Sequence, residues 1–365
     1  MYLASTAKSE EQQDLTPLVF LSGAKSTREN FHGTCMNAEP DNSSLVLLQL
    51  MEEMERTKLV DDQILSSYQI VSRNSQRRLS KHKRRSNART DMKLNTPVRQ
   101  DAVRFVCMAC LHQSFPDPES IPPGDILIIA GDFTLCGRPD EIEVFSKYLR
   151  HLPHTFKVVI AGNQECTFDD RFIKATGSKL GEKKLAVKQT LSNHFSLQEM
   201  KNAKTKLENV IYLEDSSSEL FGIKIYGTPW LPKYDDMAFN LPRGQPLLDK
   251  WNNIPSGVDV LVTHTPPLGH GDILPSDLHF GCVELLNSVV KRIRPKYHVF
   301  GHIHSGYGCT TDGYTKFINC SMVDDRLQLA NNPIIFDISI DMNKKERWMD
   351  KYRRTGYIYH DKNTL

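Results

Sequence analysis

The chain has 365 residues, of which 39% are hydrophobic, 25% charged and 8% aromatic. This composition is typical of a soluble globular protein with a full core, and it excludes fibrous chains, disordered chains and small disulfide-stapled scaffolds. Forty-six basic residues against 44 acidic ones give a net charge of +2. The chain as a whole therefore indicates no partner of a single charge sign.

The sequence offers no segment of the kind that enters a membrane. No stretch approaches the ~20 apolar residues that a membrane helix requires, and the first 30 residues contain no apolar signal-peptide core. We therefore expect a cytoplasmic protein, with the nucleus as the alternative. In either compartment the eight cysteines are expected to be reduced thiols rather than a disulfide framework.

Residues 1–97 form an N-terminal extension that differs in composition from the rest. Residues 1–43 are polar without an apolar period, so we expect them to be mostly disordered. The Leu and Met residues at 44–72 are compatible with an amphipathic helix that packs on the neighbouring domain or binds a partner. Residues 73–90 carry eight basic side chains and no acidic one. This basic arm is either a solvated segment or a contact for nucleic acid, import machinery or an anionic surface.

From about residue 103 onward the pattern is that of an α/β protein. Short runs rich in Val, Ile and aromatic residues predict strands at 104–110, 125–130, 157–161, 210–213, 223–226, 258–263, 298–300, 316–320 and 333–338. Helices are predicted at 140–152, 183–199 and 281–292. We therefore expect one domain at 98–340, followed by a charged tail at 341–365 to which the pattern assigns no structure.

Polar clusters follow five of the predicted strands, at the carboxyl ends where open α/β sheets bind their ligands. Glycines at 131, 162 and 301 allow sharp turns that bring the next side chain forward. Imidazole, carboxylate and amide groups in one place are typical of a first-row metal site with mixed N and O ligands. The clusters contain His112, Asp132, Asn163 with Gln164, His264, and His302 with His304.

Several of these residues have a structural alternative. A single His or a Gly-Asp pair after a strand is more often part of a hydrogen-bonded turn than a ligand. The i, i+2 spacing of His302 and His304 puts both rings on one face only if the chain is extended there. Cys107 and Cys110 have C-x-x-C spacing, which we interpret as two thiols on one buried strand rather than a redox or zinc motif. His270 and Asp272 could approach a substrate, but we interpret them as surface loop residues.

Together the clusters resemble the calcineurin-like metallophosphoesterase superfamily, whose pattern is D-x-H, G-D, G-N-H-[ED], H and G-H-x-H. Within it, the segments at 157–163, 241–245 and 295–302 are similar to the metallophosphoesterase domain-containing brain proteins. The resemblance covers about residues 103–338. It implies an α/β fold of four layers, in which two mixed β-sheets pack face to face with helices outside, and a two-metal phosphoesterase site.

The resemblance also implies which residues hold the divalent ions, one or two of Mn, Fe or Zn. One ion would be held by His112, Asp132 and His304. The other would be held by Asp132, which bridges the two, and by Asn163, His264 and His302. The second set is complete with respect to the family pattern.

This sequence departs from the family pattern at two positions. Cys110 stands where D-x-H has its Asp, so a thiol replaces a carboxylate ligand. Gln164 stands where G-N-H-E has the His that assists the departing alkoxide, and an amide cannot transfer a proton. The hypothesis is a phosphodiesterase of weakened activity, with cyclic nucleotides or other small phosphodiesters as substrates. The alternative is a catalytically silent protein that binds a nucleotide or a phosphorylated partner.

Overall fold

A computed structural model describes residues 92–175, 181–234, 237–275, 278–355 and 359–360 of the chain. The predicted disorder at 1–43, the predicted helix at 44–72 and the basic arm at 73–90 lie outside these residues. Within them, no helix combines the length and the apolar composition that crossing a membrane requires.

The first of two large sheets consists of strands that the sequence predicts. It contains β1 (Ala102–Met108), β2 (Ile126–Ala130), β3 (Phe156–Ile160), β4 (Ile211–Tyr212) and β13 (Ile334–Ser339), in the order β13, β1, β2, β3, β4. β1 to β4 run parallel and β13 pairs antiparallel with β1. Every residue of β1 and β2 is buried. All of them are apolar, as expected for strands covered on both faces, except Arg104 of β1, which pairs with Asp337 at 2.8 Å.

The second sheet is larger and includes strands that the sequence does not reveal. It contains β5 (Ser216–Leu220), β6 (Ile223–Thr228), β9 (Val260–Thr263), β10 (Tyr297–Phe300), β11 (Gly308–Thr311), β12 (Lys316–Asn319) and β14 (Tyr359–His360), in the order β11, β12, β10, β9, β6, β5, β14. β6, β9, β10 and β12 are parallel neighbours. β5 has the sequence SSSEL, which has little intrinsic strand preference, and it forms by pairing antiparallel with β6. A further pair of short strands, β7 (Leu231–Pro232) and β8 (Asn240–Leu241), is separate.

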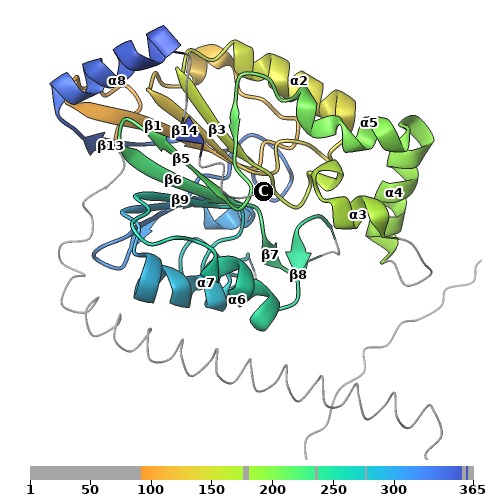
Figure 1. The fold of residues 1–365 in the computed structure, drawn as a ribbon. Coiled ribbons are helices and arrows are strands. Elements are labelled where there is room, and N and C mark those ends of the chain that lie inside the picture. The colour runs from red at the N-terminus through yellow and green to blue at the C-terminus, as the bar shows by residue number, and fades with distance from the viewer. Residues whose placement is uncertain (1–91, 176–180, 235–236, 276–277, 356–358, 361–365) are drawn as a thin grey trace, which may run out of the picture. The chain divides into compact units, whose positions relative to one another are not determined.

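The two sheets pack face to face between helices. Side chains such as Phe105 and Ile128 of the first sheet and Val260 and Val299 of the second form the core between the sheets. The alternate side chains point outward, where α2 (Pro139–Arg150) covers the first sheet and α6 (Gln245–Asn252) and α7 (Val283–Ser288) cover the second (Figure 1). The predicted architecture of two packed mixed sheets flanked by helices is confirmed.

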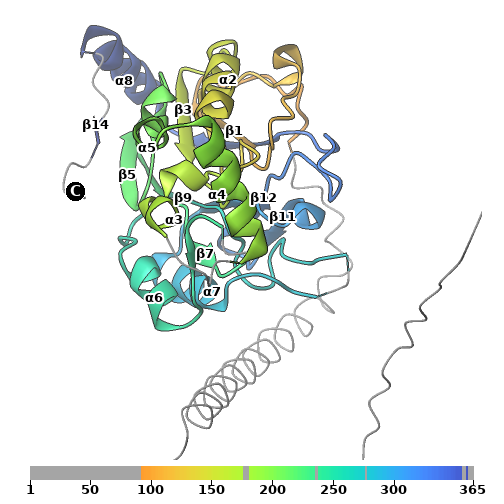
Figure 2. The same ribbon diagram turned by 90° about the vertical axis from the view of Figure 1, so that its right-hand side faces the viewer.

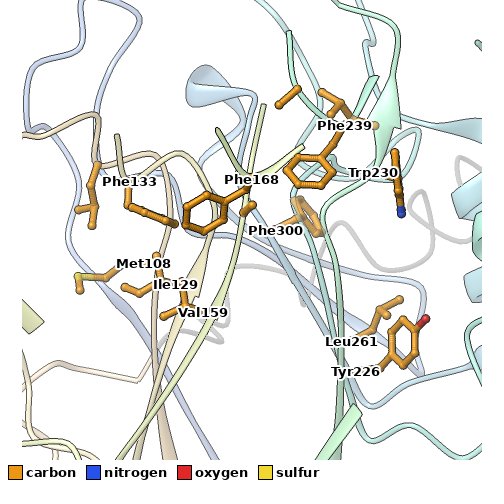
Figure 3. Close-up of a cluster of buried hydrophobic side chains, with 14 of the residues drawn as sticks. Met108, Ile129, Phe133, Val159, Phe168, Tyr226, Trp230, Phe239, Leu261 and Phe300 are labelled. Carbon is orange, nitrogen blue, oxygen red and sulfur yellow. The ribbon is translucent and has the colours of Figure 1, made fainter. Parts of the chain in front are cut away.

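The outward-facing side chains continue into a second buried cluster (Figure 3). Met108, Ile129 and Val159 come from three neighbouring strands of the first sheet, and Tyr226 and Leu261 come from the second. Aromatic residues of the loops beyond the strands belong to the same cluster. These loops, which also carry the polar clusters, are therefore anchored by buried rings.

A helical flank stands beside the loops, on the right of Figure 1 and facing the viewer in Figure 2. It contains α3 (Asp170–Lys174), α4 (Glu182–His194) and α5 (Leu197–Lys201). The sequence predicts one helix at 183–199, but Phe195 is extended and Ser196 is the N-cap residue of α5. The reason is a capping box, in which the Ser196 hydroxyl and the Glu199 carboxylate satisfy each other's backbone N–H groups.

Residues 341–365, to which the sequence pattern assigns no structure, contain α8 (Met342–Thr355). Trp348 packs against Phe156 and Phe221, with ring centroids 5.2 and 4.7 Å apart. Lys345 pairs with Asp125 at 2.9 Å, at the amino ends of the parallel strands. α8 therefore closes the end of the sandwich opposite to the polar clusters. Shorter helical turns lie at Pro118–Ser120, Cys166–Phe168, Ala203–Lys206, Val289–Ile293 and His304–Gly306.

Candidate metal centre

The polar clusters converge at the carboxyl ends of β1, β2 and β3 in one sheet and of β9 and β10 in the other. The side chains form two sets, in each of which the ligand atoms lie within 4.8 Å of one another. The Asp132 group consists of Asp132, His264 and His302, and the Cys110 group consists of Cys110, His112 and His304. The structure thus brings together the histidines and the aspartate that the sequence singles out.

The loops reach this arrangement through a strained backbone. Cys110, His112, Asp132 and His302 all have positive φ angles, between 44° and 68°, in the left-handed region that side chains other than glycine avoid. His302 is therefore not extended, so the condition under which the i, i+2 spacing would put the rings of His302 and His304 on one face is not met. The two rings belong to different groups of the centre.

Two glycines are required here for different reasons. Gly131 has a φ of 89°, so it makes the turn that the sequence predicts. Gly162 does not have a positive φ, but a Cβ atom there would overlap the carboxylate of Asp132 and the ring of His264. Close approach, rather than a turn, is the reason for a glycine at 162.

A buried carboxylate that the sequence analysis does not single out holds the loops together. Glu165 accepts hydrogen bonds from the backbone N–H groups of Asp132 (2.9 Å), Gly162 (2.6 Å) and Thr134 (2.9 Å), and from the Thr134 hydroxyl (2.8 Å). Burial and the nearby charge of Asp132 raise the pKa of Glu165 to about 7. Its position in the sequence could have revealed this role, because an acidic residue in the loop after a buried strand requires a hydrogen-bond partner.

In the Asp132 group, acceptors face one another across short distances. Nδ1 of His264 donates to the carbonyl of Ala130 at 2.8 Å. Its Nε2 then lies 3.0 Å from Oδ1 of Asn163 and 3.2 Å from Oδ2 of Asp132. A lone pair and two oxygens in such contact repel unless a proton or a metal cation lies among them. The geometry therefore fits a bound cation.

The pKa shifts of these residues also agree with a bound cation. Burial acts to lower the pKa of His264, but the adjacent Asp132 carboxylate outweighs it and raises that pKa, so the site favours positive charge. Burial also acts against ionisation of Asp132, yet its attraction to His264 lowers the pKa of the carboxyl. Burial lowers the pKa of His302 to about 3, so its ring is neutral near pH 7 and keeps a lone pair for a metal.

The Cys110 group adjoins the first group through Asp132. Nε2 of His112 lies 3.2 Å from Nε2 of His304 and 3.9 Å from Oδ2 of Asp132. Nδ1 of His304 donates to the carbonyl of Asp324 at 3.1 Å, which leaves its Nε2 as the ligand atom. The same carboxylate oxygen thus lies near His112 and His264, as a ligand between two ions would.

Comparison with known proteins identifies the protein family of this chain. The model of the calcineurin-like phosphoesterase family matches residues 103–306. The chain belongs to this family. Its members typically bind divalent metals, and the predicted resemblance is confirmed.

Similar proteins match about two thirds to three quarters of the chain. UPF0046 protein T07D4.2 of Caenorhabditis elegans is 55% identical over 276 residues, which are 75% of this chain and 69% of the relative. Metallophosphoesterase domain-containing protein 1 of Homo sapiens is 45% identical over 259 residues, 68% of this chain and 76% of the relative. The protein of the same name from Mus musculus gives the same values.

Cys110, at the first departure from the family pattern, is not on a strand, because β1 ends at Met108. The interpretation of Cys107 and Cys110 as two thiols on one strand is therefore wrong for Cys110. Its Sγ accepts the backbone N–H of His302 at 3.0 Å and lies 3.5 Å from the Ser321 hydroxyl. Burial raises the pKa of this thiol. A thiol with two imidazoles is a donor set that suits zinc, provided that the metal displaces the proton.

Gln164, at the second departure, contributes through its backbone. Its N–H donates to Oδ1 of Asp132 at 2.9 Å, which turns the other oxygen of that carboxylate toward the histidines. The residue is half-buried.

The remaining candidates, His270 and Asp272, have structural contacts. Asp272 is fully buried, so its interpretation as a surface residue is wrong. It accepts the backbone N–H groups of Gly269 and Gly281 at 2.9 and 3.1 Å and braces their loop. The ring of His270 stacks on Phe317, with centroids 3.8 Å apart.

Proposed function

We propose that this chain is a metal-dependent phosphoesterase that hydrolyses phosphodiesters, including cyclic nucleotides, with activity weakened at Cys110 and Gln164. The observation that carries the proposal is the position of Asp132. One oxygen of its carboxylate lies 3.2 Å from His264 and 3.9 Å from His112, so one residue serves both groups. Two ions at a shared carboxylate suit the chemistry of phosphate ester hydrolysis.

Each ion would have its own ligand set. Asp132, Asn163, His264 and His302 would hold one ion, and the Cys110 group with Asp132 would hold the other. When bound, such ions polarise phosphate oxygens and lower the pKa of a water molecule.

The chain's own residues set the geometry for this chemistry. The carbonyl of Ala130 fixes His264 in the tautomer whose Nε2 faces the centre, and the carbonyl of Asp324 does the same for His304. Glu165 keeps the loops of Asp132 and Gly162 in register, since it accepts a hydrogen bond from the backbone of each.

Gln164 determines which esters would react. Its amide can donate a hydrogen bond to a phosphate or to a departing oxygen but cannot supply a proton. General acid catalysis contributes about 10² to 10⁴ in rate, and least where the leaving group is a stable anion. Aryl esters are therefore expected to react much faster than alkyl esters.

Hydrolysis of bis(p-nitrophenyl) phosphate with and without Mn²⁺ or Zn²⁺ tests the proposal. We expect slow metal-dependent turnover by the natural chain, and faster turnover by the Cys110→Asp, Gln164→His double variant. Lys147→Met, on the exposed side of α2, is the matched control and should behave as the natural chain. Absence of metal-dependent turnover in both the natural chain and the double variant would contradict the proposal.

A second function is favoured by where the two departures lie. The ligands of the Asp132 group and Asn163 match the family pattern, whereas Cys110 and Gln164 lie at the positions that serve the other ion and proton transfer. A silent protein that keeps one metal and binds a nucleotide or a phosphorylated partner would show this pattern. Calorimetry with nucleoside monophosphates and Mn²⁺ tests it, because binding without turnover by the double variant supports this function and absence of binding excludes it.

We further propose that the basic arm at 73–90 directs the chain to nucleic acid, import machinery or an anionic surface, and so to the cytoplasm or the nucleus. The charge of the segment supports this, since it contains no acidic residue. A fluorescent fusion that lacks residues 73–90 tests the proposal. An unchanged distribution in the cell would contradict it.

A further inference from the structure

Asn319 is a buried polar residue in contact with the loop at 301–306, which carries His302 and His304. It is the last residue of β12, which lies between β11 and β10 in the second sheet (Figure 2). Asn319 is fully buried. Burying an amide costs free energy unless its donors and its acceptor have partners, so the partners of this side chain indicate its role.

The NH₂ group of Asn319 faces carbonyls of two loops. Nδ2 lies 2.7 Å from the carbonyl oxygen of Ile303, 2.8 Å from that of Gly271 and 3.5 Å from that of Gly301. Ile303 and Gly301 belong to the loop at 301–306, and Gly271 belongs to the loop that follows β9 and His264. The amide therefore fastens together two loops that carry residues of the metal centre.

Asn319 holds the peptide that precedes His304. The carbonyl of Ile303 accepts the Asn319 amide at 2.7 Å and the backbone N–H of Gly306 at 3.0 Å. Because a peptide unit is planar, bonds to its oxygen also restrain the Cα atom of the residue that follows. Since Nδ1 of His304 donates to the carbonyl of Asp324 at 3.1 Å, this histidine is held at both its backbone and its ring.

The peptide that precedes His302 is held from two sides as well. The carbonyl of Gly301 faces Nδ2 of Asn319, and the N–H of His302 donates to Sγ of Cys110 at 3.0 Å. With this peptide in place, His302 adopts its positive φ of 68° and belongs to the Asp132 group. The same amide thus contacts the peptides before both ligand histidines of the loop.

The acceptor of the amide extends this support to the thiol. Oδ1 of Asn319 accepts the backbone N–H of Ser321 at 3.1 Å, and the hydroxyl of Ser321 lies 3.5 Å from Sγ of Cys110. An amide offers two donors at one end and an acceptor at the other, whereas a carboxylate of the same shape has no donor and a leucine has neither. The contacts therefore require the chemistry of asparagine.

The two loops are packed tightly around this side chain. A Cβ atom at Gly306 would come within 3.0 Å of Nδ2 of Asn319 and would overlap the carbonyl of Gly271. A Cβ atom at Gly271 would lie 2.9 Å from Cβ of Asn319. Such close-packed surroundings transmit a change in one side chain to their neighbours, so we expect the loops to shift when the amide is replaced.

We propose that Asn319 is a positioning residue of the metal centre. It holds the peptides before His302 and His304 so that the first ring faces the Asp132 group and the second faces the Cys110 group. The inference rests on the metal centre of the proposed function but not on turnover. It assigns to Asn319 the sharing of two histidines from one loop between two ions.

Zinc titration of the full chain tests this inference. Asn319→Asp keeps the shape and the acceptor but removes both donors, and Asn319→Leu removes the donors and the acceptor without adding a charge. Because the loop carries one histidine of each group, we expect both ions to bind about 10- to 100-fold more weakly in each variant, the usual effect of losing a residue that orients a metal ligand.

Thr315→Val is the matched control for a purely structural effect. Thr315 precedes β12, is buried, and donates its hydroxyl to the carbonyl of Pro295 at 2.7 Å. The variant removes a buried side chain–backbone hydrogen bond at the amino end of the same strand. We expect it to lower the midpoint of thermal unfolding in chelator about as much as Asn319→Leu does, and to leave both zinc affinities unchanged.

The outcomes separate this inference from the proposed function. If Asn319→Asp and Asn319→Leu lowered the unfolding midpoint but bound both zinc ions as tightly as the natural chain, the positioning role of Asn319 would be overturned and the phosphoesterase would be unaffected. If the variants bound both ions more weakly but the natural chain hydrolysed no phosphodiester, the positioning role would be supported and the phosphoesterase would be overturned. A natural chain that bound no zinc would overturn both.

Discussion

The Asp132 group and the Cys110 group lie at the same edge of the two sheets, but they differ in ligand chemistry. In the first, a carboxylate and an imidazole meet at 3.2 Å, and the carboxylate raises the pKa of His264 in favour of positive charge. In the second, two imidazoles meet a thiol whose pKa is raised by burial, so a metal must displace its proton. The fold thus fixes where the ligands lie, whereas the residue at 110 determines which ion is held and how tightly.

The groups also differ in their support. Glu165 ties the loop of Asp132 to that of Gly162, so the Asp132 group is held by a buried ionisable residue. In the Cys110 group, backbone atoms provide the support, through the carbonyl of Asp324 and the N–H of His302. We therefore expect the first group to bind metal more tightly and to depend more on single side chains.

Asp132→Asn should have the largest effect, because the carboxylate of Asp132 lies near ligands of both groups. The amide cannot balance two cations, so we expect both ions to be lost and metal-dependent turnover to fall by at least about 10³-fold. Elemental analysis and hydrolysis of bis(p-nitrophenyl) phosphate measure this. Asp140→Asn, at the exposed start of α2, is the control. If Asp132→Asn still bound two ions, the claim that both ions depend on Asp132 would be wrong.

Gln164→His should restore a proton donor without altering either group's ligands. We expect the rate on alkyl esters to rise by about 10²-fold and the rate on p-nitrophenyl esters to change much less, because p-nitrophenolate needs no proton. The measurement is kcat for the two ester types in the same metal. A similar gain on both would show that residue 164 acts on metal binding rather than on the leaving group.

Glu165→Gln should weaken the Asp132 group specifically. The carboxylate accepts four hydrogen bonds, and a Gln side chain would turn its NH₂ toward backbone donors. Loss of such a supporting residue typically costs 10- to 100-fold in metal affinity, so we expect about this reduction for the tighter ion. Metal titration measures the affinity, and thermal unfolding in chelator verifies that the chain is folded. Equal weakening of both ions would argue against two distinct groups.

The smallest expected effect is the pH dependence of folding stability that His298 causes. This residue lies next to the Asp132 group. Its Nε2 lies 2.8 Å from the hydroxyl of Thr263, the residue before His264. Burial lowers the pKa of His298 to about 3, whereas in the unfolded chain it is about 6.5. The unfolded chain therefore takes up a proton first as the pH falls below 6.5, and stability falls with it.

Between pH 7 and pH 5.5 this residue should lower the free energy of unfolding by about 1 kcal/mol. His298→Gln should show a correspondingly smaller decrease over that interval, measured by urea unfolding in chelator. His151→Gln, an exposed histidine at the end of α2, should retain the full decrease. The same decrease in His298→Gln and in the natural chain would contradict this assignment.

The strands that position the centre could be predicted from sequence, because parallel strands buried on both faces are largely apolar runs, as in β2 and, apart from Arg104, in β1. The loop residues of both groups, apart from Cys110, could be predicted for the same reason, since each follows such a run. β5 could not, because its Ser-rich sequence forms a strand only through its partner β6. Trp348 and Tyr352 of α8 lie in a strongly charged segment, so their packing on the sandwich was also hidden.

The contacts within the centre were harder to predict from the sequence than its location. The role of Glu165 depends on the contact between two loops that are more than 30 residues apart in sequence. The positive φ of His302, which separates its ring from that of His304, depends on the same kind of contact, because its N–H donates to Cys110. Spacing within one segment cannot reveal either.

Metal stoichiometry of the natural chain and of Cys110→Ser tests the central claim most directly. Two groups that share Asp132 but differ in ligand chemistry should give two ions per chain with unequal affinity in a zinc titration. Cys110→Ser should abolish the weaker ion and leave one ion per chain, with the tighter affinity unchanged. Two ions of unchanged affinity in Cys110→Ser, or a single ion in the natural chain, would contradict the claim.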